Sequence, residues 1–255
     1  MLNSYKIIIV GLGYLCYSMG MADLNTQYEE MEANYKEIFI EAAEMIRAAI
    51  DKFKPDYSCK SCRINCNIQK VDIFADFPGG CPFYNWQMQA LTYLTTTYAE
   101  KLKKAKAKIL EGREKCKCNM CGACCKLAVS EFSYTQLKQK AMRGDKFATM
   151  FTSVFVPYES EEEAEKAVPE YFALSNELLD PNERVYFYYC PKLTPDNKCS
   201  DYENRPLLCK DFPITALKLL PSTCGYLPWR NGANKLAMSI KAREDIIAFY
   251  KQKLG

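Results

Sequence analysis

Cysteine is the residue type in this sequence best able to do chemistry, and histidine is missing altogether. The chain of 255 residues carries fourteen cysteines and no histidine. Without an imidazole it cannot form a Ser-His-Asp triad, a Cys-His pair or a histidine-based zinc hydrolase site. Any metal would therefore be held mainly by thiolate sulfur, which favours zinc, Cu(I) or iron–sulfur clusters.

Twelve of the cysteines fall into three groups of four, which suits tetrathiolate chemistry better than random pairing. The second group reads CxxCGxCC, and Gly122 within it permits the positive φ that a tight turn around a metal often needs. The side chains of Cys124 and Cys125 diverge unless the backbone turns sharply, so one of them could bind a different ion or be a buried thiol. The predicted metal ligands are Cys59, Cys62, Cys66 and Cys81 in the first group, Cys118, Cys121, Cys124 and Cys125 in the second, and Cys190, Cys199, Cys209 and Cys224 in the third.

A secreted disulfide scaffold is the alternative interpretation of so many cysteines. Residues 7–16 form a short apolar stretch after Lys6, as in the core of a signal peptide. The cleavage site is weak, however, and removing the leader would leave thirteen cysteines, an odd number for pairing. We therefore expect a cytoplasmic protein with reduced thiols, in which residues 1–21 are a leader or a non-native start. Export is the alternative if residues 1–20 are a signal peptide.

The third group extends the cysteine pattern to a known family. Cys190 opens a CPxL motif, C-x2-Y-E-x-R-P-x2-C runs from Cys199 to Cys209, and a Phe-Pro pair follows. Together with CxxCGxCC, this order resembles the YkgJ-family cysteine-cluster proteins, which are described as zinc- or iron-chelating domains. It is also similar to the cysteine cluster of the flagellin lysine N-methylases. The resemblance covers about residues 116–224 and implies that Cys118, Cys121, Cys124, Cys125, Cys190, Cys199 and Cys209 bind metal.

Two side chains inside the third motif are predicted to bind the cofactor beside the thiolates. The guanidinium of Arg205 would offset the negative charge of a thiolate cluster, or would form an ordinary ion pair with Glu203 or Asp211. Tyr202 could donate to a sulfur, or could pack in the core.

The first cysteine group, C-x2-C-x3-C-x14-C, lies between two predicted long helices. Four thiolates there would make a closed tetrahedral site that fixes the connection, with two disulfides or free thiols as alternatives. The first helix follows a capping box at Thr26–Glu29, has apolar residues at steps of three and four from Met31 to Phe53, and ends at Pro55. The second runs from Pro82 to Gly112, and we expect the two to pack as an antiparallel hairpin.

Shorter elements follow. We expect helices at 133–142, with a Ser133–Gln136 capping box, at 160–168 and at 234–254, and strands at 154–156 and 185–189. The predicted fold is mainly α with a small irregular β component. It has a helical hairpin with its own four-cysteine connection at residues 22–112 and a loop-rich cysteine-cluster domain at residues 113–255.

The function predicted from these patterns is metal binding, through an iron–sulfur cluster or Zn²⁺ held by cysteine thiolates. The alternative is an enzyme of the protein-lysine methylase or redox type that uses the cluster. A net charge of +3 gives no strong nucleic-acid signal, and no apolar run is long enough for a membrane span. Five lysines between Lys101 and Lys108 could touch phosphate, although a solvated helix face explains them better. The expected partner is the metal ion. A protein partner is also possible, but the sequence does not identify one.

Overall fold

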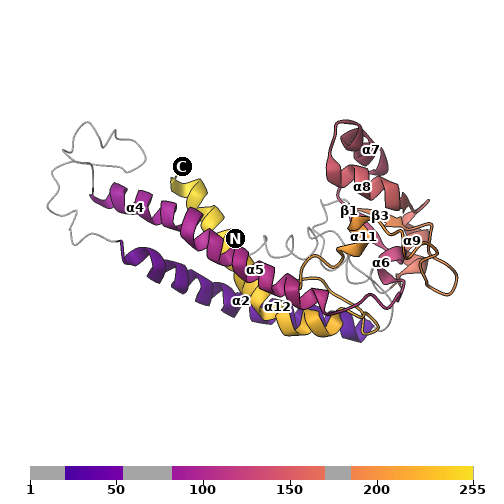
Figure 1. Cartoon of the computed structure of the whole chain (residues 1–255), viewed down its shortest axis with the longest axis horizontal. Helices are drawn as coiled ribbons and strands as arrows, with labels where there is room; N and C mark the ends of the chain where they lie inside the picture. The colour runs from indigo at the N-terminus through magenta and orange to yellow at the C-terminus, as the bar shows by residue number, and fades with distance from the viewer. Residues whose placement is uncertain (1–20, 54–81, 170–184, 255) are drawn as a thin grey trace. The chain divides into compact units, whose positions relative to one another are not determined.

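The computed structural model describes residues 21–53, 82–169 and 185–254 (Figure 1). The leader and the first cysteine group, Cys59, Cys62, Cys66 and Cys81, lie outside the described residues. The chain forms two compact units, one from Met1–Ala33 and Ile109–Ala237 and the other from Asn34–Lys108 and Met238–Gly255. The predicted division into residues 22–112 and 113–255 stays a prediction.

Helices dominate both units, with one small sheet, as the sequence predicts. The elements are α2 (Met21–Asp51), α4 (Pro82–Tyr93), the π-helix η2 (Leu94–Tyr98), α5 (Ala99–Glu114), α6 (Ala123–Lys126), β1 (Ala128–Ser130), α7 (Tyr134–Met142), α8 (Lys146–Val154), β2 (Val156–Pro157), α9 (Glu161–Ala167), β3 (Tyr186–Tyr189), α11 (Leu207–Lys210) and α12 (Leu227–Leu254).

The long helices of the second unit pack through a few specific contacts. The indole N–H of Trp86 in α4 donates to the carbonyl of Ile50 in α2 at 2.8 Å, so the end of α2 lies beside the start of α4. This is the arrangement that an antiparallel hairpin requires. Lys106 of α5 pairs with Glu244 of α12 at 2.7 Å.

The long helices differ from the prediction at their ends and in one turn. Helix α2 already begins at Met21, so Thr26 lies inside it and the predicted capping box there is wrong. The second helix is interrupted by η2, where the carbonyl of Thr92 accepts hydrogen bonds from the hydroxyls of Thr95 and Thr96 at 3.3 and 2.7 Å. Such side-chain bonds compete with the regular helical ladder.

The small sheet has the strand order β1-β3-β2, with antiparallel pairing throughout. Tyr188 of β3 is fully buried, and its ring meets Phe151 of α8 edge-on at a centroid distance of 5.0 Å. Neither α8 nor β1 was expected. The strand predicted at 154–156 begins only at Val156, because Val154 completes α8.

Side-chain caps explain where the short helices of the first unit begin. Ser133 forms the predicted capping box with Gln136, and Ser160 caps α9 as expected. Asp145 accepts from the N–H of Ala148 and thereby starts α8. These caps satisfy backbone donors that would otherwise lack partners.

Helix α12 starts at Leu227, seven residues before the predicted start at Asn234. Pro228 does not prevent this, because a proline fits the first turn of a helix. Trp229 is buried, and its indole N–H donates to the carbonyl of Ile109 at 2.8 Å.

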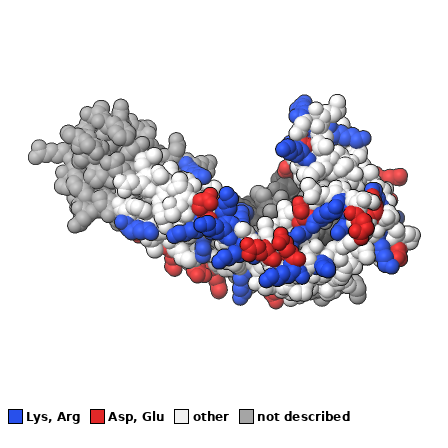
Figure 2. Space-filling model, viewed as in Figure 1, with Lys and Arg blue, Asp and Glu red and all other residues white. Residues whose placement is uncertain are grey.

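Charged side chains cover the outer face of α5. The five lysines from Lys101 to Lys108 are exposed, and Figure 2 shows basic and acidic side chains interspersed around this helix. This pattern agrees with a solvated face. No helix among the described residues combines the length and the apolar character that crossing a bilayer demands.

Candidate metal centre

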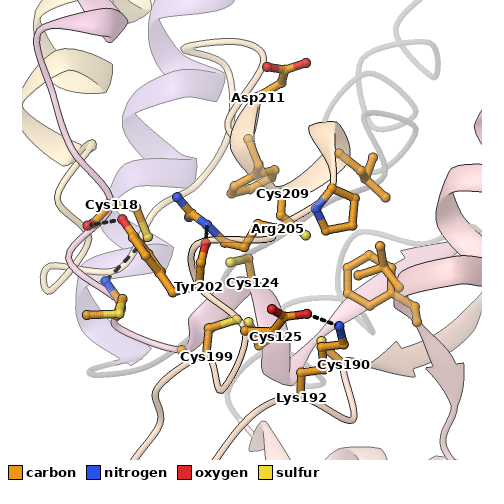
Figure 3. A pocket seen from close by; sticks show the side chains of 18 of the residues that line it. Cys118, Cys124, Cys125, Cys190, Lys192, Cys199, Tyr202, Arg205, Cys209 and Asp211 are labelled. Carbon is orange, nitrogen blue, oxygen red and sulfur yellow. Dashed lines mark hydrogen bonds and ion pairs between the residues drawn. The ribbon is translucent and has the colours of Figure 1, made fainter.

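A single cavity of about 400 Å³ in the first unit brings together the second and third cysteine groups. Figure 3 shows that Cys124, Cys199 and Cys209 face the same central space although they come from separate segments. Cys116, which belongs to no group, does not line the cavity. The cysteines that do are Cys118, Cys121, Cys124, Cys125, Cys190, Cys199, Cys209 and Cys224.

A glycine brings the CxxCGxCC loop against the segment that carries Cys199. Gly122 has the predicted positive φ, at 77°, immediately before α6. A Cβ at this position would lie only 2.5 Å from the carbonyl oxygen of Asn197. Only glycine allows both this φ and this close approach, so Gly122 sets the distance between the two cysteine segments.

The segment from Cys190 to Asp201 folds back on itself. The N–H of Cys190 donates to the carbonyl of Cys125 at 2.7 Å, which attaches this segment to the end of α6. Backbone pairing continues between Leu193 and Cys199. An ion pair between Lys192 and Asp201 joins the two sides of this folded segment beside the cavity.

Asn119 attaches the last cysteine of the third group to the first cysteine of the second. Its side-chain amide donates to the carbonyl of Thr223 and its amide oxygen accepts from the N–H of Gly225 at 3.2 Å. A Cβ on Gly225 would lie 2.2 Å from the carbonyl oxygen of Lys117. Cys224 is therefore held beside the CxxCGxCC loop from both sides.

Arg113 fixes the segment that follows Cys209 on α11. Its guanidinium donates to the carbonyls of Lys210, Phe212 and Pro213 at 2.6, 2.9 and 3.0 Å. Three charge-assisted hydrogen bonds from one planar group hold three carbonyl oxygens in a defined arrangement.

Six of the eight cysteines that line the cavity belong to two separate hydrophobic clusters. Cys121, Cys124 and Cys224 pack with Ala123 and Leu220. The other cluster, built around residues such as Phe151 and Tyr188, contains Cys125, Cys190 and Cys209. The neighbours Cys124 and Cys125 thus belong to different clusters.

Contacts between thiols shift the pKa values of these cysteines in opposite directions. A hydrogen bond with Cys224 lowers the pKa of Cys121 to about 6, and the same contact raises the pKa of Cys224. The pKa of Cys125 is raised through its contact with Cys124, and that of Cys190 through its contact with Cys125. Burial raises the pKa of Cys209 to about 11. The sulfurs are close enough that one negative charge suppresses the next.

Hydrogen-bond donors also contact Cys118, which lines the cavity. The backbone N–H of Met120 donates to the sulfur of Cys118 at 3.4 Å, as in loops that hold thiolates. The hydroxyl of Tyr202 donates to the carbonyl of Cys118 at 3.1 Å, and Arg205 stacks on the Tyr202 ring at 3.7 Å. Among the described residues, Arg205 forms no ion pair with a carboxylate, so the predicted pairing with Glu203 or Asp211 is wrong.

The structure gives the thiols no bond to each other and no closed ligand set. No disulfide links any two of the nine cysteines in the described ranges. Within those same ranges, no three Cys, Asp or Glu side chains are grouped so as to hold one metal ion. The eight cysteines instead line one cavity of about 400 Å³.

Several residues that build the site were missed by the sequence reasoning. Asn119 and Arg113 act on backbone groups about a hundred residues away, and such acceptors leave no mark on the sequence. Asn197 could have been found, because the run Pro195-Asp196-Asn197 is a turn signal. Its φ of 63° is the left-handed value that asparagine tolerates.

The fold and the cavity together define a mainly helical protein with a cysteine cluster. Residues 117–225 match the sequence model of the CxxCxxCC family, described as "Putative zinc- or iron-chelating domain". The match spans the whole set of cysteines that line the cavity, and it confirms the resemblance seen in the motifs. No curated protein and no solved structure matches the chain.

Proposed function

We propose that the cavity binds a metal through cysteine thiolates, as zinc or as an iron–sulfur cluster. The observation that carries this proposal is the convergence of eight cysteines, from four separate segments, on one cavity. Cysteine packs well as a small apolar residue, but a core has no reason to place eight thiols along one open space. The residues that would hold the metal are Cys118, Cys121, Cys124, Cys125, Cys190, Cys199, Cys209 and Cys224.

The surroundings of the sulfurs support this chemistry. Thiolates bind metal only after losing their protons, and the raised pKa values of Cys125 and Cys190 indicate that charging every thiol without a cation is unfavourable. A metal removes that repulsion, and the positive charge of Arg205 offsets what remains. When bound, the metal would supply either a structural cross-link or an electron-transfer centre.

Elemental analysis and a visible spectrum of the full chain, purified anaerobically, test the proposal. We expect bound zinc in a colourless protein, or iron with absorption near about 400 nm in a brown one. Cys121→Ser and Cys124→Ser should each lower the metal content. Cys116→Ser is the matched control and should leave it unchanged, since Cys116 lies outside the cavity. A metal-free, disulfide-bonded chain would overturn the proposal.

An enzyme of the redox or protein-lysine methylase type is the second candidate, favoured by the size of the cavity. A catalytic centre needs an open position next to the metal and room for a substrate. An electron-transfer or catalytic cluster predicts reversible bleaching of the visible band by dithionite, which zinc would not show.

The remaining predictions concern the compartment and the first cysteine group. Thiolates persist in a reducing cytoplasm, which is where we place the protein. Cys59, Cys62, Cys66 and Cys81 stay a predicted second metal site. Changing all four of these cysteines to serine should lower the total metal content but leave the metal bound in the cavity unchanged.

A further inference from the structure

The cavity is larger than thiolate coordination of an ion requires. In a closed tetrahedral site each sulfur lies about 2.3 Å from the metal, and little space is left between the ligands. A volume of about 400 Å³ instead falls within the range of pockets that bind small organic molecules, roughly 300–1,000 Å³. With a single thiolate-bound ion in place, part of the cavity is therefore available to a second ligand.

Part of the cavity lining consists of large apolar side chains from two helices. Phe147 and Met150 come from α8, and Leu207 comes from α11. They are 41%, 36% and 65% exposed, unusual values for side chains of this kind grouped around one opening. Exposed apolar surface beside a hollow marks a binding site more often than a structural feature.

Of the two cations that line the cavity, only Arg205 lacks a carboxylate partner among the described residues. Lys192 and Asp201 neutralise each other. The carboxylate of Asp211 points away from the sulfurs (Figure 3). The Nε of Arg205 donates to the carbonyl of Tyr202 at 2.9 Å and its guanidinium stacks on the Tyr202 ring, but it forms no ion pair with a carboxylate of the described residues. A planar guanidinium that forms no ion pair suits the carboxylate of a ligand.

We propose that the cavity binds a small organic acid whose aromatic or branched aliphatic body lies against α8 and α11 and whose carboxylate pairs with Arg205. The inference rests on the proposed function, in that metal and acid would share one cavity. The apolar wall holds the body of the acid without using the sulfurs for it. Charge complementarity selects an acid over a neutral molecule of the same shape.

Binding of 2-naphthoate to the full, metal-loaded chain tests the proposal, with 2-naphthamide as the neutral probe. Titration calorimetry should show one acid bound per chain, on the order of tenfold more tightly than the amide, since hydrogen bonds to a charged group are the stronger ones. Arg205→Gln should remove the preference for the acid. Equal affinities for acid and amide in the parent chain would overturn the role of Arg205.

A matched pair of methionine variants tests the apolar wall. Met150→Glu should weaken both probes at least tenfold, because a charged group replaces an apolar contact. Met142→Glu should leave both affinities unchanged, because Met142 is 87% exposed and lies outside the cavity. Equal loss in the two variants, or no saturable binding of either probe to the parent chain, would refute the inference.

Metal content measured in the same samples separates this inference from the proposed function. Met150→Glu should keep the full metal content, while Cys124→Ser should lower it. A parent chain with normal metal and no probe binding would sink only the acid site. A chain that binds 2-naphthoate but never contains metal would sink only the metal centre.

Discussion

Replacing Gly122 with alanine should destabilise the first unit by more than backbone strain alone explains. At its φ of 77° an alanine pays the left-handed penalty of about 1–2 kcal/mol. The new Cβ would also lie 2.5 Å from the carbonyl oxygen of Asn197, where ordinary contact begins at 3.4 Å. The neighbouring segment must therefore move by 3.4 − 2.5, or about 0.9 Å. Overpacking of this kind costs about 1–3 kcal/mol, which gives a total of about 2–5 kcal/mol.

Gly144→Ala supplies the matched control for this measurement. Gly144 has a φ of 88°, but a Cβ there would meet nothing within 4 Å, so only the penalty of about 1–2 kcal/mol applies. Urea unfolding followed by circular dichroism gives both free energies, and elemental analysis gives the metal content. Gly122→Ala should lower both the free energy of unfolding and the metal content more than Gly144→Ala does, because the displaced segment carries Cys199. Equal destabilisation by the two variants would refute the idea that Gly122 sets the distance between the cysteine segments.

Three further changes test how the site is built. Arg113→Met should lower the free energy of unfolding by about 2 kcal/mol, since it removes hydrogen bonds to three carbonyls; an unchanged urea midpoint would argue against a clamp. Asn119→Ala should reduce both stability, by about 1–2 kcal/mol, and metal content, because it releases Thr223 and Gly225 beside Cys224. If the metal content of that variant stays full, Asn119 does not position the cysteine. Ser133→Ala should cost about 1 kcal/mol in thermal or urea unfolding with no change in metal content, as it removes only a helix cap.

Local features of the first unit could be predicted wherever a few neighbouring residues decide the structure. The Ser133–Gln136 capping box needs only a hydroxyl and an amide three residues apart, and it forms as expected. The positive φ of Gly122 was also predictable, since a CxxCG turn demands it. Both depend on chemistry carried by the residues themselves.

The apolar run near residue 154 shows why other elements could not be assigned. Val154, Phe155 and Val156 are β-branched or aromatic, which favours a strand. Phe151 and Val154, however, also continue a helical stripe that begins after Asp145, and burial of Phe151 against Tyr188 favours the helix. A short apolar run fits either element, and only the packing of β3 decides between them.

The cysteines of the site were predictable, but the way they are brought together was not. Thiol spacing and motif order predicted twelve cysteines as metal ligands, and eight of them line the cavity. The contacts that gather them are made by Arg113 and Asn119 on backbone carbonyls and N–H groups, which every residue possesses. No pattern of residue types can reveal such acceptors in advance.

The adjacent Cys124 and Cys125 acquire a physical explanation from the two hydrophobic clusters. Consecutive residues of a helix point about 100° apart, so α6 directs Cys124 toward the cluster with Leu220 and Cys125 toward the cluster with Phe151. The two thiols still influence each other, since Cys124 raises the pKa of Cys125. Two adjacent cysteines on one helical turn can therefore place one thiol in each of the two hydrophobic clusters. Separating the pair by one inserted residue would rotate Cys125 out of its cluster while leaving every thiol in the chain, and the cavity would lose its link to Cys190.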